Sequence, residues 1–472
     1  MNEITGQVTE FLTQALRRPV APDDDYFALG LADSCSRWSW SPSSRSGSRS
    51  PSRWRTSTWT ASAPPRGSPA SSRPSRVTPP DWARAMTRPP EAVPEPVRAA
   101  RELAARWLLP AAAWDRSEGL PREVAGALAR AGLLAPDVPA EYGGAGTGQQ
   151  ELGEVCATLG GVCGAVRGLV TVQGMVAAGL RRWGTAGQRG TWLPRLTSGE
   201  LVAAFAATEQ DAGSALAHVA TTVEEDGDDL VVSGRKRWVT CGQFADLVLV
   251  LGRAPGGLAA VLVETGLPGV RREAVTGQLG MRAARIAHLE FDAVRVPRDH
   301  LVAPVGLGLS HVAATVLDHG RHTVAWGCVG MAEAALHDAV THAGTRFQGG
   351  TPLSAHQSVR AVLARSAVAA TGARELCRRA ARARTHEPGR AVHETVLAKY
   401  AAADAAAAVT RDAVQILGSA GCAPDSRAGR LFRDAKVMEI IEGAQHVAET
   451  HIADRLFRDH GVPAPRQDGA TA

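Results

Sequence analysis

Residues 433–445, RDAKVMEIIEGAQ, contain an acidic side chain in a position suited to general-base chemistry. Apolar residues recur there at helical spacing, which predicts an amphipathic helix over residues 433–441. Glu442 follows this helix and precedes Gly443, a common place for a helix to end. Burial beside two isoleucines would raise the pKa of Glu442, and a raised pKa suits removal of a weakly acidic C–H proton near neutral pH. The plainer alternative is a solvated helix end.

Residues 433–445 resemble the C-terminal signature of the acyl-CoA dehydrogenase family, RDAKITEIYEGT, and further motifs extend the resemblance over residues 95–458. The resemblance implies an FAD cofactor. It also implies that Glu442 takes the α-proton of an acyl thioester while the β-hydrogen leaves as hydride to flavin N5. Ala444 and His446 stand where the family usually has Thr and Gln. Each change removes an expected dinucleotide contact, so we expect weaker FAD affinity.

A second motif, AFAATEQDAGSA at residues 204–215, resembles the flavin loop of this family. The resemblance implies that Thr208 and Ser214 hydrogen-bond the flavin or the thioester substrate. Hydroxyl and backbone N–H groups at such a place can stabilise a reduced, anionic isoalloxazine. Gln210 replaces the usual Pro and Ala215 the usual Asp, so the loop loses rigidity and one polar contact. Taken alone, the segment is an ordinary turn.

A third motif, GRKRWVTCG at residues 234–242, resembles the pattern G-x-K-x-WITNG. Trp238 would then pack on the flavin, and Thr240 would hydrogen-bond near flavin N5. Packing of an aromatic pair is worth about 1 kcal/mol beyond burial. Without the surrounding pattern, a single Trp in a strand is usually a core residue.

VLDHGR, residues 316–321, matches the family's L-D-x-x-R. The resemblance implies that Asp318 and Arg321 border the substrate pantetheine or the flavin. The alternative is a surface ion pair at i, i+3 on a helix, worth only about 0.2–0.5 kcal/mol.

A longer motif, TRFQGGTPLSAHQ at residues 345–357, resembles R-x-QFGxPLxxxQ. Arg346 would bind the FAD pyrophosphate of a neighbouring subunit, because a guanidinium fork suits phosphate. Gln357, together with Gln415 and Gly418 in QILGSAG, matches further FAD contacts of the family. The resemblance therefore implies a homodimer or homotetramer.

The elements that must hold these residues change type in blocks. Residues 95–200 have helical periodicity, residues 201–305 contain strand-like runs such as ADLVLVLGR, and residues 306–460 are long, Ala-rich helices. Blocks rather than alternation argue against a Rossmann sheet. With the resemblance, the pattern predicts an α+β multidomain protein with an all-α N-terminal domain, a central β-barrel and a C-terminal four-helix bundle. Residues 461–472 form a tail.

The composition is that of a globular protein, with 472 residues, 44% of them hydrophobic, and a net charge of +5. Nine Arg and one Asp between residues 35 and 85 contribute +8, so the remainder carries −3, and we predict no nucleic-acid partner. The seven Cys are scattered without a CxxC pair, which suits free thiols, and we predict no metal site. No leader and no apolar run of about 18 residues is present, so we expect a cytoplasmic protein with no membrane partner.

Residues 1–34 resemble the first helix, acidic loop and Asp-Ser site of an acyl carrier protein. Ser34 would carry phosphopantetheine at the start of a helix, where free N–H groups favour an anion. The alternative is an ordinary Asp-Ser helix cap. Residues 35–94 are then rich in Ser, Arg, Pro and Trp, and this composition is typical of a low-complexity linker. The alternative is an out-of-frame translation, because back-translation in a shifted frame gives amphipathic sequence. We expect the working enzyme to begin near Met86.

These motifs predict an FAD-dependent acyl-CoA or acyl-carrier dehydrogenase, an oxidoreductase that acts on CH–CH bonds. A carrier-like segment beside a dehydrogenase resembles the gene sets for hydroxymalonyl- or methoxymalonyl-type extender units in polyketide antibiotic biosynthesis. There a hydroxylated three-carbon acyl group is oxidised while bound to a carrier protein. Two alternatives stay open: a flavin oxidase or monooxygenase on the same fold, and a non-enzymatic carrier or binding protein that has lost FAD.

Overall fold

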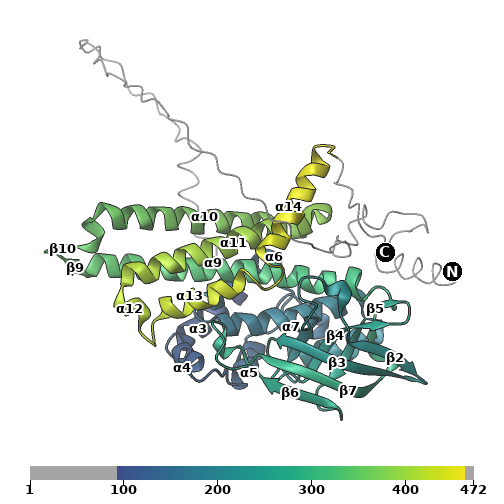
Figure 1. Cartoon of the computed structure of the whole chain (residues 1–472). Coiled ribbons are helices and arrows are strands. Elements are labelled where there is room, and N and C mark those ends of the chain that lie inside the picture. The colour runs from purple at the N-terminus through teal and green to yellow at the C-terminus, as the bar shows by residue number, and fades with distance from the viewer. Residues whose placement is uncertain (1–92, 463–472) are drawn as a thin grey trace, which may run out of the picture. The chain divides into compact units, whose positions relative to one another are not determined.

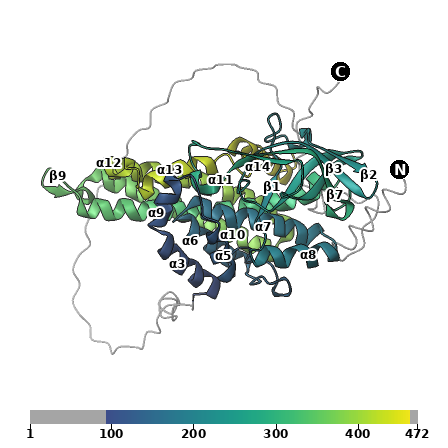
Figure 2. The same ribbon diagram turned by 90° about the horizontal axis from the view of Figure 1, so that it is seen from below.

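A computed structural model describes residues 93–462 of the chain (Figures 1 and 2). The predictions for Ser34, for residues 35–92 and for most of the tail lie outside the described residues. The described part begins with helices, continues as a sheet and ends in long helices, so the predicted fold class is confirmed.

The N-terminal part contains short and medium helices. Its longest helix, α7, is buried along nearly its whole length, as expected from its apolar sequence. Helix α8 begins at a capping box, in which Thr185 Oγ1 accepts from Gln188 N at 3.1 Å and Gln188 Oε1 accepts from Thr185 N at 2.9 Å. The elements are α3 (Glu95–Trp107), α4 (Pro110–Arg116), α5 (Glu123–Arg130), η1 (Ala140–Tyr142), α6 (Gln149–Gly160), α7 (Gly164–Trp183) and α8 (Ala186–Thr197).

The middle part is an eight-stranded mixed sheet with the order β6-β7-β3-β2-β4-β5-β8, and β1 also pairs with β4. Strands β1 and β2 run parallel to β4, and the other pairs are antiparallel. Among the described strands, β6 and β8 end the ladder, so the expected β-barrel is not closed by strand pairing. The strands are β1 (Ala203–Ala206), β2 (Thr222–Asp226), β3 (Asp229–Val239), β4 (Leu247–Ala254), β5 (Gly257–Glu264), β6 (Val270–Ala274), β7 (Ala287–Pro297) and β8 (Leu301–Val302).

Strand β4 is buried on both faces, which explains its continuous apolar run. Leu247 and Leu249 belong to the core shared with the helices, whereas Val248 and Val250 belong to the separate core of the β domain. This alternation follows from the two-residue period of a strand. The sheet is thereby fixed against the N-terminal helices: β1 packs against α7, and Leu249 of β4 lies beside Gly179 of the same helix.

The C-terminal part is built on α9, a long helix that packs against α6, α7, α10, α11 and α13. A hairpin of β9 and β10 joins α9 to α10, and its two turn residues, Gly349 and Gly350, both have positive φ. The elements are η5 (Gly308–Ala313), α9 (Ala314–Thr345), β9 (Phe347–Gln348), β10 (Thr351–Pro352), η6 (Leu353–Ala355), α10 (Gln357–His386), α11 (Pro388–Leu417), α12 (Ser419–Cys422), α13 (Arg427–Met438) and α14 (Gln445–Asp459).

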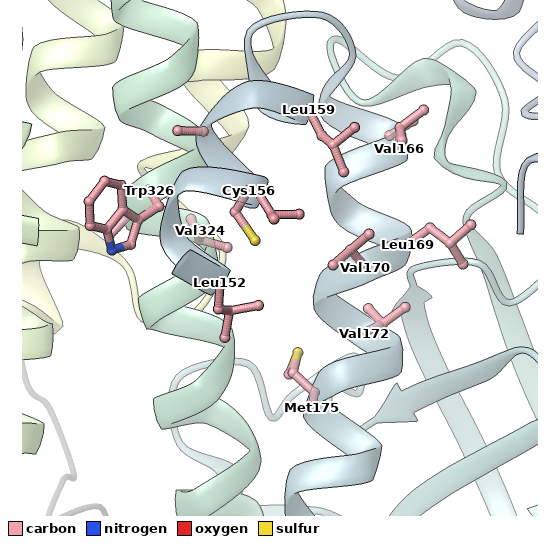
Figure 3. Packing of buried hydrophobic residues seen from close by; sticks show 14 of the residues in the cluster. Leu152, Cys156, Leu159, Val166, Leu169, Val170, Val172, Met175, Val324 and Trp326 are labelled. Carbon is pink, nitrogen blue, oxygen red and sulfur yellow. The ribbon is translucent and has the colours of Figure 1, made fainter. Parts of the chain in front are cut away.

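The core between α6, α7 and α9 explains how the N- and C-terminal parts stay together. Figure 3 shows Leu152 and Cys156 of α6 between side chains of α7 and α9. The helix backbones approach closely, because a Cβ at Gly330 of α9 would collide with the carbonyl oxygen of Ala157 in α6. Glycine is therefore required at residue 330. None of the helices within residues 93–462 is long and apolar enough to span a bilayer.

Candidate active site

Glu442 lies in the loop between α13 and α14 and not at a helix end. Helix α13 stops at Met438, so the prediction of a helix over residues 433–441 was wrong at its C-terminal side. Glu442 has φ 53° and Gly443 has φ 91°, both in the left-handed region, which a right-handed helix excludes. The left-handed backbone turns the chain into α14 and leaves Ile440 60% exposed.

The carboxylate of Glu442 points into the protein. The residue as a whole is half-buried, but its Oε2 is inaccessible and has no hydrogen-bond partner among the described residues. An ideal Cβ at Gly320 of α9 would lie 2.6 Å from this Oε2 and 3.0 Å from Sδ of Met175, so only glycine leaves room there. Burial raises the pKa of Glu442 to about 7, against the opposing effect of Arg321, Lys399 and Arg167.

Two cations hold the backbone of this loop. Arg321 Nε donates to the carbonyl oxygen of Glu442 at 3.2 Å, and Lys399 Nζ donates to that of Gly443 at 2.7 Å. Lys399 is only 2% exposed, and burial lowers its pKa to about 8. Because both cations bind carbonyl groups, they fix the position of Glu442 and leave its carboxylate free to accept a proton.

Asp318 and Arg321 face different partners. Asp318 forms an ion pair with Arg384 of α10, and Arg384 Nε also donates to Gln149 Oε1 at 2.7 Å. The alternative of an i, i+3 surface pair between Asp318 and Arg321 is therefore wrong. Of the two, Arg321 contacts the loop of Glu442, whereas Asp318 joins α9 to α10.

The predicted flavin loop is held by a buried ion pair that the sequence analysis missed. Glu209 accepts from Lys236 Nζ at 2.7 Å and from the backbone N–H groups of Ala220 at 2.6 Å and Thr221 at 3.0 Å. Lys236 is fully buried, and burial lowers its pKa to about 8. This pair ties the loop to β3.

The two hydroxyl residues of the flavin loop are not fully buried. Thr208 is half-buried and Ser214 is exposed. The side chains predicted to contact the cofactor thus lie on the surface of a loop whose base is fixed. The arrangement suits contact with a bound molecule.

Trp238 sits at an irregularity of β3, where the pairing with β7 shifts between Lys236 and Val239. Its φ of 57° is left-handed, and the indole is 54% exposed. Trp238 N donates to His288 Nδ1 at 3.2 Å, and the two rings meet edge to face. The alternative that Trp238 is a core residue is therefore wrong.

Helix α7 brings Thr240 and Glu442 to one region. An ideal Cβ at Gly168 of α7 would lie 3.8 Å from Cγ2 of Thr240, and Met175 of the same helix and the carboxylate of Glu442 both lie close to Gly320. Positions 168 and 175 are two helical turns apart, roughly 10 Å at 1.5 Å per residue. Thr240, in the turn after β3, and Glu442, in the loop after α13, thus both lie near one helix although they are far apart in sequence.

The other four predicted FAD residues lie elsewhere. Arg346 follows α9, Gln357 begins α10, and Gln415 and Gly418 are at the end of α11. All four are exposed and lie at the bundle end that carries β9, β10 and α12 (Figure 1). At 1.5 Å per residue, α9 separates Arg346 from Gly320, beside Glu442, by roughly 39 Å. One chain therefore does not bring all the predicted residues together.

Sequence reasoning also missed Lys399 and Arg167. Each had a signal: Lys399 is the only lysine of the alanine-rich helix α11, and Arg167 is a single charge in the apolar first half of α7. Both are buried. A charged residue within an apolar helical stretch is expensive to bury and is therefore a candidate for function.

The described chain thus combines a helical domain, a β domain and a helical bundle with a buried carboxylate oxygen of Glu442 that has no hydrogen-bond partner among the described residues. Family models match three consecutive segments: acyl-CoA dehydrogenase N-terminal domain (residues 95–200), middle domain (204–294) and C-terminal domain (307–457). The chain belongs to the acyl-CoA dehydrogenase family, whose members are FAD-dependent oxidoreductases acting on CH–CH bonds.

Individual relatives agree with this assignment. The chain is 33% identical over 367 residues to the mouse short-chain specific acyl-CoA dehydrogenase of mitochondria, covering 76% of this chain and 89% of that protein. Among solved structures, the chain is similar to FkbI, which is described as acting in biosynthesis of the methoxymalonyl extender unit of the FK520 polyketide immunosuppressant. The two chains are 40% identical and superpose with a TM-score of 0.72, and the match covers 77% of this chain and 99% of FkbI. A Mycobacterium smegmatis glutaryl-CoA dehydrogenase in complex with FADH2 is 28% identical, with a TM-score of 0.74 and 79% and 95% covered.

Proposed function

We propose that the protein dehydrogenates a short acyl thioester attached to a carrier protein, in the assembly of a malonyl-type polyketide extender unit. The likeness to FkbI over nearly the whole of that protein supports the pathway. The carrier-like sequence of residues 1–34 supports a carrier-bound substrate. The observation that carries the chemistry is the buried, unpartnered carboxylate of Glu442, with a pKa of about 7.

Glu442 takes the proton from the α-carbon of the thioester. A base whose pKa lies near the working pH is ionised in a large fraction of molecules and still binds a proton strongly. Arg321 and Lys399 hold the loop through its carbonyl groups, so Glu442 is positioned without its charge being neutralised directly. Its Oε2 atom is inaccessible to solvent and lies beside Gly320.

The residues present fit an FAD molecule shared by two chains. Trp238 would offer its half-exposed indole to the ring system, and Thr208, Ser214 and Thr240 would supply polar groups to it. Bound FAD supplies the acceptor for the two electrons that leave with the β-hydrogen of the substrate.

Arg346, Gln357, Gln415 and Gly418 would hold the dinucleotide end of the FAD bound by a second copy. The separation along α9, roughly 39 Å, is more than one FAD molecule bridges, which supports a homodimer or homotetramer.

The test is an anaerobic titration of the FAD-loaded protein with acyl thioesters of a carrier protein and of CoA, followed by flavin absorbance. We expect bleaching with carrier thioesters at lower concentration than with CoA thioesters. Failure of every thioester to reduce the flavin would refute the dehydrogenase proposal. Rapid reoxidation of the reduced flavin by O₂ would instead favour a flavin oxidase.

A further inference from the structure

His288 of β7 lies beside Trp238, the residue that we place against the flavin ring system. The pairing of β3 with β7 is irregular between Lys236 and Val239, where β3 takes three steps, from 236 to 239, against two steps of β7, from 289 to 287. One extra residue is therefore inserted in β3, and Arg237 and Trp238 together oppose His288, as in a β-bulge. Because a bulge re-aims the side chains that it carries, the residue opposite helps to set the direction of the indole.

The backbone N–H groups of the bulge are both bonded within the predicted flavin site. Arg237 N donates to the carbonyl oxygen of Thr208 in the flavin loop at 2.8 Å. Trp238 N donates to His288 Nδ1 at 3.2 Å. The φ of Trp238, 57°, is a left-handed value that a bulky residue adopts only when its surroundings hold it there. The acceptor on His288 is part of those surroundings.

This hydrogen bond fixes the protonation state of His288. A backbone N–H can only donate, so Nδ1 must present its lone pair, and the ring is neutral with its proton on Nε2. Protonation of the ring would turn Nδ1 into a donor. The bond to Trp238 N would then be lost, and two N–H groups would face each other.

The rings of His288 and Trp238 are also in contact. Their centroids lie 5.6 Å apart and their planes meet at 83°, an edge-to-face arrangement. In such a pair the positive edge of one ring meets the negative face of the other, which favours one relative orientation. The contact therefore restrains an indole that the core of the protein does not enclose.

The charged groups around His288 keep its ring neutral near neutral pH. Burial, the largest effect, lowers the pKa of His288 from 6.5, and the charges of Arg237 and Arg235 lower it as well. Glu273 of β6, directly opposite His288 in the ladder, opposes them, but it forms an ion pair with Arg235. Glu290, two residues along β7, is paired with an arginine of β6. The ring therefore gains a proton only as the pH falls below 6.5.

We propose that His288 is a positioning residue for the flavin: its neutral ring holds the indole of Trp238 against the flavin ring system, and protonation of the ring releases the indole. The affinity for FAD is then complete above pH 6.5 and falls as the pH drops below this value. This inference rests on the proposed function, since it assumes that the flavin lies against Trp238. It adds that a side chain of β7 makes cofactor binding sensitive to acid.

The experiment measures the dissociation constant of FAD by flavin fluorescence between about pH 5 and about pH 8. The Glu442→Gln background removes the titration of the proposed base. We expect this parent protein to bind FAD about 3- to 10-fold more weakly at the acid end, because a hydrogen bond that holds Trp238 is lost. A dissociation constant that does not rise in acid would overturn the proposal, and this comparison needs no change at His288.

Two variants separate the acceptor from the ring. His288→Asn places an amide oxygen where Nδ1 lies, so it should keep most of the affinity at about pH 8 and lose the weakening in acid. His288→Phe keeps an aromatic edge without the acceptor, so it should bind FAD about 3- to 10-fold more weakly at every pH. The same pH dependence in the parent and in both variants would refute the role of His288.

His300→Phe is the matched control. His300 also meets a tryptophan edge to face, with its ring centroid 5.3 Å from that of Trp192, but this tryptophan is a buried residue of α8. Its Nδ1 lies 3.0 Å from the carbonyl oxygen of Leu262, so it must donate. His300→Phe should leave the FAD affinity and its pH dependence as in the parent. Equal effects of His300→Phe and His288→Phe would contradict a specific role for His288.

A second measurement follows the indole itself by fluorine NMR of FAD-loaded protein labelled with 5-fluorotryptophan. The resonance that is absent from Trp238→Phe belongs to Trp238. It should shift with pH in the parent and stay in place in His288→Asn. A Trp238 resonance that does not respond to pH in the parent would contradict the release of the indole.

Failure of this inference is distinguishable from failure of the proposed function. If thioesters reduce the flavin of the wild-type protein but His288→Asn leaves the pH dependence of FAD binding unchanged, only the role of His288 is wrong. If FAD binding and the fluorine resonance both follow His288 while no thioester reduces the flavin, the positioning role stands and the dehydrogenase proposal fails. Each variant is accepted for the comparison when its melting temperature at about pH 8 matches that of its parent.

Discussion

Glu442→Gln tests whether burial shifts the proton affinity of the proposed base. The change keeps the shape of the side chain and removes its charge. Burial raises the pKa of Glu442 from 4.5 to about 7, and each pKa unit corresponds to about 1.36 kcal/mol. Ionisation of buried Glu442 therefore lowers the free energy of unfolding by about 3 kcal/mol. Gln at this position carries no charge and has no such cost.

The sign of the pH dependence follows from which state loses the proton first. Below pH 4.5 the group is protonated in both the folded and the unfolded protein, and the cost is absent. Between pH 4.5 and about 7 the unfolded state releases the proton while the folded state retains it, so the stability of the wild-type protein falls as the pH rises. Above about pH 7 the cost is constant.

The assay is the melting temperature of FAD-loaded wild-type and Glu442→Gln protein across this pH range. We expect the difference to grow in favour of the variant by a few degrees and to level off above pH 7. Other titrating groups are common to both proteins and cancel in the difference. A difference that is constant with pH would refute the raised pKa. The same variant should keep its bound flavin, and the rate at which the substrate reduces this flavin should fall by about 10²- to 10⁴-fold.

Three further changes test the surroundings of the site. Lys399→Met should move the rising limb of the pH–rate profile for flavin reduction to higher pH, because Lys399 lowers the pKa of Glu442; an unmoved limb would contradict this role. Arg346→Ala should weaken FAD binding by about 1.5–3 kcal/mol, or one to two decades, in a fluorescence titration, and unchanged affinity would count against the placement of the pyrophosphate. Gly330→Ala should lower the melting temperature because its Cβ meets the Ala157 carbonyl, whereas Gly344→Ala in the same helix has open space and should be neutral or stabilising by up to about 1 kcal/mol. Equal effects of the two glycine changes would show that close packing of α9 on α6 is not the cause.

The block order of the fold could be predicted because it depends on local periodicity. The runs that became β4 and β5 are recognisable from their apolar, β-branched residues, and α9 from its length. The end of α13 could not be predicted. It depends on the left-handed backbone of Glu442, which is fixed by contacts with Arg321 and Lys399.

The candidate site shows the same limit. Glu442 lies in a recognisable motif, but Arg321 and Lys399 are 121 and 44 residues distant from the carbonyl groups they bind. Only the packing of α9, α11 and the loop after α13 places them together. Gly320 has no signal in sequence, because its role is to leave a space for a carboxylate from another element.

The separation of Arg346 from Glu442 along α9 has a genetic consequence. If two chains share each FAD, each site takes Glu442 from one chain and Arg346 from the other. In a mixed dimer of a chain defective at Glu442 and a chain defective at Arg346, one site receives both defects. The other site receives an intact Glu442 from the chain defective at Arg346 and an intact Arg346 from the chain defective at Glu442. Two inactive proteins, mixed and reassembled, should therefore recover activity in trans, up to half that of the wild-type dimer per chain.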